Sequence, residues 1–149
     1  MKKIILLFIF VFVVSCGFKP MLSVSKTNFS LNKIEYKNKL GKSIYNNLKQ
    51  YLNKDDKKNY YTVLLNTTEK KKIILKDKKG NASSFRLTVI SEVSVYEGNQ
   101  LKFTKKFKET FDYNNSSKKF ELSKYDDEIK KNLLNKISNR IIMDIYKIQ

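Results

Sequence analysis

Three consecutive runs of alternating apolar and polar residues constrain the fold of this chain most. In the clearest run, residues 85–96, one face is apolar, with Ile90 as an exception on the other face. The run at 60–76 alternates at its start, and in the run at 100–113 the predicted inward residues are Leu101, Phe103, Phe107, Phe111 and Tyr113. A period of two predicts half-buried antiparallel strands.

Two turn signals separate these runs, at residues 77–81 and 97–99, and each contains a glycine. Both connections are short enough for hairpins, so the three strands are expected to form a meander. A shorter strand is expected before them, at residues 31–36.

Two segments have helical spacing instead. Residues 38–53 carry apolar side chains at every fourth position, and Asn38 is a suitable N-cap. A second helix is expected from a capping-box pattern at Ser123, with a long apolar stripe made of Tyr125, Ile129, Leu133, Ile137, Ile141 and Ile145. The stripe favours a helix that faces the core, and a helix lying on a membrane surface is the alternative.

The order strand, helix, three strands, helix predicts an α+β fold. We expect a two-layer sandwich of about four mostly antiparallel strands packed on two helices. The expected division of the chain is a signal at 1–15, a tether at 16–30 and a single domain at 31–149.

The N-terminus has the pattern of an export signal. Lys2 and Lys3 precede eleven apolar residues, a run too short to cross a bilayer, and Ser15 and Cys16 follow. Residues 13–16 resemble the lipobox of bacterial lipoproteins. That resemblance implies cleavage before Cys16, a diacylglyceryl group on its thiol, and an acyl chain such as palmitate on its amine. A short signal anchor, or an export signal without lipid, is the alternative.

The composition argues against an enzyme. The chain has no histidine, a single cysteine and four scattered glycines, which leaves no metal cluster and no glycine-rich phosphate loop. Carboxylates at Asp126, Asp127 and Glu128 are better explained as the favourable acidic first turn of a helix than as catalytic groups. We therefore expect no cofactor, no metal and no catalytic residue.

The net charge of +17 suggests an anionic partner, and removal of Lys2 and Lys3 with the signal lowers it to +15. Only Arg86 and Arg140 are arginine, so a lysine excess produced by an AT-rich genome explains the charge equally well. Nucleic acid is disfavoured as the partner, because the aromatic residues at 103–111 share the predicted inward face and the signal exports the chain.

Residues 16–21, CGFKPM, resemble the CGFxPLY-type start of the LPS-assembly lipoproteins of alphaproteobacteria, the LptE family. Met21 and Leu22 replace the usual leucine–tyrosine pair, and residues 139–142 resemble the final helix of that family. The resemblance implies a non-enzymatic lipoprotein on the periplasmic side of the outer membrane. It also implies that the chain plugs an LPS-transport barrel of the LptD type, helps it assemble, and binds lipopolysaccharide.

A lipopolysaccharide site needs cations for phosphate beside apolar surface for acyl chains. The best cluster lies around the turn at 77–81 and comprises Lys70, Lys71, Lys72, Lys76, Lys78, Lys79 and Arg86. A second row is Lys102, Lys105, Lys106 and Lys108. In this row Lys102, Lys106 and Lys108 are expected to face away from the helices. Solvated lysine faces are the alternative for both sets, and a pilot protein for another envelope machine is the alternative function.

Overall fold

The computed structural model describes residues 27–149, so the predicted signal, Cys16 and the start of the tether lie outside the described residues. The elements follow the predicted order: β1 (Phe29–Tyr36), α2 (Lys39–Leu48), the 3₁₀ helix η3 (Lys49–Tyr51), β2 (Asn59–Lys76), β3 (Ala82–Glu97), β4 (Gln100–Asn114) and α3 (Lys119–Tyr146). The predicted α+β class is confirmed.

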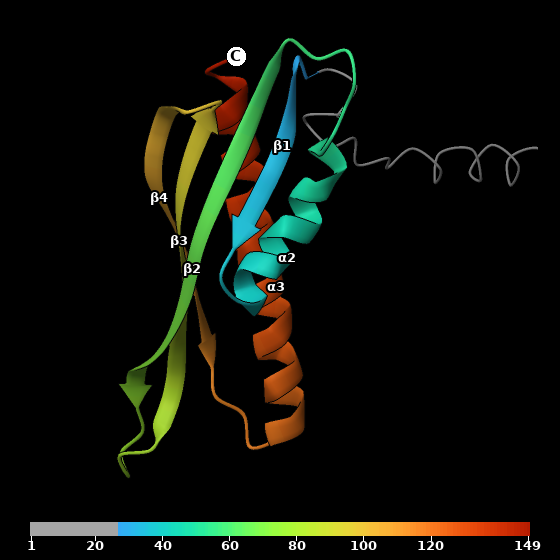
Figure 1. The fold of residues 1–149 in the computed structure, drawn as a ribbon. Helices are drawn as coiled ribbons and strands as arrows, with labels where there is room; N and C mark the ends of the chain where they lie inside the picture. Colours follow the sequence, from blue (N-terminus) through green and yellow to red (C-terminus); the bar gives the residue numbers. More distant parts are fainter. Residues whose placement is uncertain (1–26) are drawn as a thin grey trace, which may run out of the picture.

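The sheet has the order β1-β2-β3-β4. The strands β2, β3 and β4 form the predicted meander of two hairpins, whereas β1 runs parallel to β2. Gly80 and Gly98 occupy the two turns with φ of 85° and 56°, a conformation that glycine adopts without steric cost. Figure 1 shows α2 and α3 together on one side of the sheet, which makes two layers.

The core lies between the sheet and the helices. The predicted stripe of α3 supplies Ile129, Leu133, Ile137, Ile141 and Ile145, all buried. The sheet supplies Val63, Val89, Val93, Val95 and Phe107, which are fully buried. Prediction and structure agree because side chains return to the same face every 3.6 residues in a helix and every two residues in a strand. The apolar residues at these spacings are the ones that become buried.

The strand β1 begins at Phe29, two residues before the predicted start, so residues 29 and 30 belong to the domain and not to the tether. Phe29 is fully buried and stacks on the ring of Tyr51, with 5.9 Å between ring centroids. Ser30 Oγ donates to the carbonyl of Tyr51 and accepts the N–H of Lys54. These long-range contacts extend the strand, and the local pattern of residues does not show them.

The helix α3 begins at Lys119, four residues before the predicted capping box at Ser123, and Lys118 at its N-cap makes no side-chain cap hydrogen bond. The first residue of the predicted stripe, Tyr125, is 44% exposed, and its ring makes an edge contact with the ring of the buried Tyr113. The acidic residues 126–128 therefore lie in the second turn onward rather than in the first.

A β-bulge near the start of β4 makes the predicted inner face of this strand partly wrong. Val95 lies opposite Phe103 but Tyr96 lies opposite Leu101, so Lys102 is the extra residue. A one-residue shift moves a side chain to the other face of a sheet. Leu101, predicted inward, is accordingly exposed, and Lys102, predicted outward, approaches the buried Tyr61. Phe111 keeps the predicted face but remains 40% exposed.

The predicted N-cap at Asn38 is confirmed. Its side-chain oxygen accepts the N–H of Gly41 at 3.0 Å, and its amide donates to the carbonyl of Thr67 at 2.7 Å. We expect Asn38→Ala to lower the free energy of unfolding by about 1–2 kcal/mol, because it removes the cap and one link to β2. Urea unfolding followed by circular dichroism measures this, and the exposed Asn46→Ala on the same helix is the control. Equal losses in both variants would contradict the assignment.

Candidate anion-binding groove on the outer face of the sheet

The face of the sheet that points away from the helices carries an open groove. The register places Thr68, Ile90 and Lys108 in one row across three strands, and Lys70, Thr88 and Thr110 in the next row. The groove has a volume of about 470 Å³ and is lined by Lys70, Lys72, Ile74, Arg86, Thr88, Ile90, Lys108 and Thr110. It therefore combines cations, hydroxyls and two isoleucines in one place.

One cation of the groove is neutralised within the protein. Arg86 donates Nε to Asp112 Oδ1 and Nη2 to Asp112 Oδ2, both at 2.7 Å. This paired hydrogen bond from Arg86 lowers the pKa of the Asp112 carboxyl and raises that of the guanidinium. Arg86 belongs to the groove as predicted, but its charge is already matched.

Three lysines of the groove remain without a matched charge. Within residues 27–149, no carboxylate lies within 4 Å of the ammonium group of Lys70, Lys72 or Lys108. Three positive charges on β2 and β4, the two strands that flank β3, lie beside apolar side chains and can bind a phosphate group attached to an apolar body.

Lys71 lies on the opposite face of β2, because successive side chains of a strand point to opposite sides. Its Nζ donates to Asp126 Oδ2 of α3 at 2.5 Å and lies 4.3 Å from the centre of the Phe85 ring. Burial lowers the pKa of Lys71, but the hydrogen bond to Asp126 and the charge of that carboxylate outweigh burial, and the pKa is raised. Lys71 therefore links the sheet to α3 and does not join the groove.

The remaining predicted lysines, Lys76, Lys78 and Lys79, lie at the end of the β2–β3 hairpin, beyond the groove. The turn is held by Asp77, whose Oδ1 accepts the N–H groups of Lys79 and Asn81 at 2.8 Å. Figure 1 shows this end of the hairpin diverging from α3. Ile73 and Leu75 are exposed there, so the tip offers a second surface with lysines and apolar residues together.

The second predicted row of lysines is mostly paired. Lys102, Lys105 and Lys106 contact the carboxylates of Glu97, Asp144 and Glu92 at 2.6–2.8 Å. Lys106 and Lys108 face outward as predicted, and of the row only Lys108 joins the groove. The sequence predicts that Lys108 faces outward but not that it lies near Lys70 and Lys72, because the bulge at Lys102 shifts the register of β4 by one residue from a count that starts at the turn.

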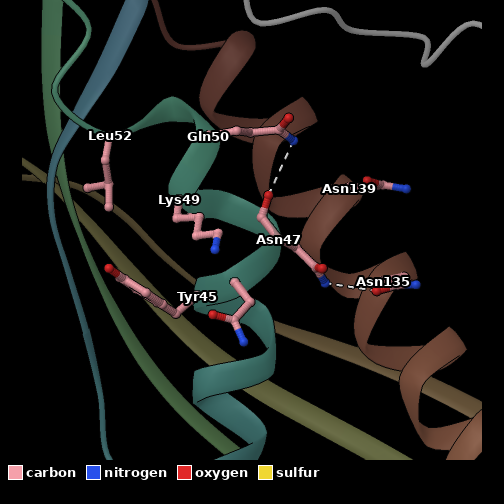
Figure 2. A pocket seen from close by; sticks show the side chains of 8 residues that line it. Tyr45, Asn47, Lys49, Gln50, Leu52, Asn135 and Asn139 are labelled. Carbon is pink, nitrogen blue, oxygen red and sulfur yellow. Dashed lines mark hydrogen bonds between the residues drawn. The ribbon is translucent and has the colours of Figure 1, made fainter.

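A larger and more polar groove, of about 830 Å³, lies between α2 and α3 and was not predicted. Figure 2 shows its amide side chains, with Asn47 pointing toward Asn135. Asn47 Nδ2 donates to Asn135 Oδ1 at 2.8 Å and to Ser138 Oγ at 3.0 Å. These bonds join the two helices, so Asn47 has a structural role in addition to lining the groove.

Residues 27–149 contain neither a candidate metal site nor a helix suited to spanning a membrane. No group of three or more acidic, histidine or cysteine side chains is arranged to hold a metal ion there. None of the helices in this part of the chain is long and apolar enough to cross a membrane.

Neither a family model nor a curated protein matches the sequence. Solved structures of bacterial lipoproteins match the fold, and two of them are from Shewanella oneidensis and Nitrosomonas europaea. Rare lipoprotein B from Shewanella oneidensis is 14% identical, with a TM-score of 0.62, over 78% of this chain and 96% of that one. Uncharacterized lipoprotein B from Nitrosomonas europaea is 12% identical, with a TM-score of 0.64, over 89% and 92% of the two chains.

A minor lipoprotein from Acinetobacter baumannii is 12% identical, with a TM-score of 0.61, over 79% of this chain and 91% of that one. At these identities the comparison concerns the fold and not the ligand or partner. The likeness covers nearly the whole of each matched chain, so the chain shares the fold of these bacterial lipoproteins.

Proposed function

We propose that this chain is a non-enzymatic lipoprotein of the outer membrane that binds lipopolysaccharide and seats in an LPS-transport β-barrel of the LptD type. The acylated Cys16 would hold it on the periplasmic side of the membrane. Two features support the proposal: the resemblance of residues 16–21 to the start of the LptE family, and the groove with unpaired lysines on the outer face of the sheet.

The unmatched charge in the groove is the observation that carries the lipopolysaccharide part. Lipid A presents phosphates and acyl chains together. Lys70, Lys72 and Lys108 supply the cations for phosphate, and Ile74 and Ile90 supply adjacent apolar surface. The groove is open, as suits a ligand that is handed on rather than enclosed.

The barrel part has different support. The outer face of the sheet is polar, and the lumen of a large membrane barrel is polar as well. The fold is shared with three bacterial lipoproteins, and the N-terminus has the residues that lipidation requires.

The test of the groove is a triple charge reversal, Lys70→Glu with Lys72→Glu and Lys108→Glu. We expect binding to purified lipopolysaccharide at low salt to weaken at least about tenfold, or 1.4 kcal/mol. The charge-matched control reverses Lys42, Lys49 and Lys136, which are exposed on the helices. A parallel variant reverses Lys76, Lys78 and Lys79 and tests the hairpin tip.

Three results are distinguishable. A loss confined to the first variant supports the groove, and a loss confined to the third moves the site to the hairpin tip. Equal losses in all three, including the helix control, would mean that net charge alone attracts lipopolysaccharide and would contradict a specific site.

A further inference from the structure

The strand β4 forms one edge of the sheet and has no strand beside it on that side in the part of the chain that the structure describes. It is long, Gln100–Asn114, and its one irregularity lies near its start. Arg140 of α3 lies near this strand, with Nη1 3.5 Å from the carbonyl oxygen of Lys108. An edge strand of this length offers backbone groups that can pair with another strand.

The same strand carries an aromatic side chain without full cover. Phe111 is on the helix side of the sheet, as are Phe103 and Phe107, yet it is 40% exposed. Phe103 is only partly buried as well. A strand added beside β4 would cover these two rings from the open side.

The sequence of β4 is complementary to itself when two copies run antiparallel with Phe107 opposite Phe107. In that register Phe103 lies opposite Phe111, Thr104 opposite Thr110, and Lys105 opposite Glu109. Aromatic pairs, threonine pairs and opposite charges are the cross-strand combinations that stabilise a sheet.

Neighbouring registers lose this match. The side chains keep their faces only when the register shifts by two residues. A shift in one direction places Phe107 opposite Lys105, and a shift in the other places it opposite Glu109. The register centred on Phe107 is therefore selected by both charge and apolar contact.

Lys105 and Glu109, which would pair between copies, each already contact an opposite charge on α3 of their own copy. Lys105 Nζ lies 2.6 Å from Asp144, and Glu109 accepts from Arg140, so pairing Lys105 with Glu109 of the other copy joins two ion pairs into one network. The unfavourable contact is Lys106 opposite Lys108, which the two-fold symmetry produces twice, and the 2.8 Å contact between Lys106 and Glu92 in each copy reduces it.

From this complementarity we propose that two copies of the chain pair antiparallel through β4, with Phe107 on the two-fold axis. Their sheets then form one continuous eight-stranded sheet with the helices of both copies on the same side. The contact is isologous, because the same strand serves both partners. The proposal does not depend on the lipopolysaccharide groove or on the barrel.

Thiol cross-linking of the mature, detergent-solubilised chain tests the register. Copies carrying Thr104→Cys are mixed with copies carrying Thr110→Cys and treated with a short bifunctional thiol reagent. We expect a cross-linked dimer in the mixture, since paired Cβ atoms lie about 4.5–5.5 Å apart. Each variant alone is expected to give little product, because its own thiols would be about 20 Å apart, six residues along the strand.

The wild-type chain controls for Cys16, and Thr88→Cys mixed with Thr104→Cys controls for random encounters, since residue 88 lies one strand inside the edge. Sedimentation of the wild type gives the mass independently, and a dimer is expected at high protein concentration. A monomer at every concentration, or equal cross-linking in the single variants and the mixture, would overturn the proposal.

Discussion

Phe107→Ala is expected to destabilise the domain by about 3–5 kcal/mol, the usual cost of removing a fully buried aromatic ring. Phe107 is fully buried on the helix side of β4, where its ring lies 5.5 Å from the guanidinium of Arg140. Folded proteins of this size have a total stability of about 5–15 kcal/mol, so the variant should lose a large share of it.

Urea unfolding at low protein concentration measures the change in the monomer, because association through β4 would add stability that depends on concentration. The control is Phe120→Ala, since Phe120 is 72% exposed at the start of α3 and its loss should change stability by less than about 0.5 kcal/mol. Similar midpoints for the two variants would mean that β4 does not pack on α3 as described.

When copies of the chain outnumber the proposed barrel partner, membrane retention is expected to depend on the proposed lipid at Cys16. When residues 17–149 are exported behind a conventional cleaved signal, the protein should appear in the soluble periplasmic fraction. The native chain should require detergent, because each buried CH₂ contributes about 0.8 kcal/mol and the fourteen CH₂ groups of one sixteen-carbon chain therefore contribute about 11 kcal/mol.

Mass spectrometry of the native N-terminal peptide supplies the chemical check. It should begin at Cys16 and carry the mass of the diacylglyceryl group and the added acyl chain. A bare thiol, or equal membrane retention of both forms, would contradict the anchor. The unanchored form should have the same free energy of unfolding as the native chain. This result would show that the variant is mislocalised and not unfolded.

The fold was largely predictable because its elements bury residues at their own periods. The stripe of α3 from Ile129 to Ile145 and the inner face of β3 from Leu87 to Val95 could be found by counting. The bulge at Lys102 was not predictable in this way, because nothing in the local composition marks an extra residue in a strand of this kind.

The candidate site was less predictable, because it depends on contacts between elements. Local clustering grouped Lys70, Lys71 and Lys72, but strand alternation sends Lys71 to the other face, where Asp126 of α3 neutralises it. Lys108 lies far along the chain from Lys70 and enters the groove only through the register of two hairpins. Pairing partners such as Asp112 for Arg86 likewise become visible only once that register is known.

The most direct test of the proposed function is a gentle detergent pull-down of the mature, acylated chain from its own cells, with identification of the membrane protein that accompanies it. The account predicts an LPS-transport β-barrel of the LptD type, recovered in a comparable amount and absent when an unrelated lipoprotein is used as bait. Recovery of a secretin-type ring in its place would indicate a pilot protein and would contradict the account, as would recovery of no barrel.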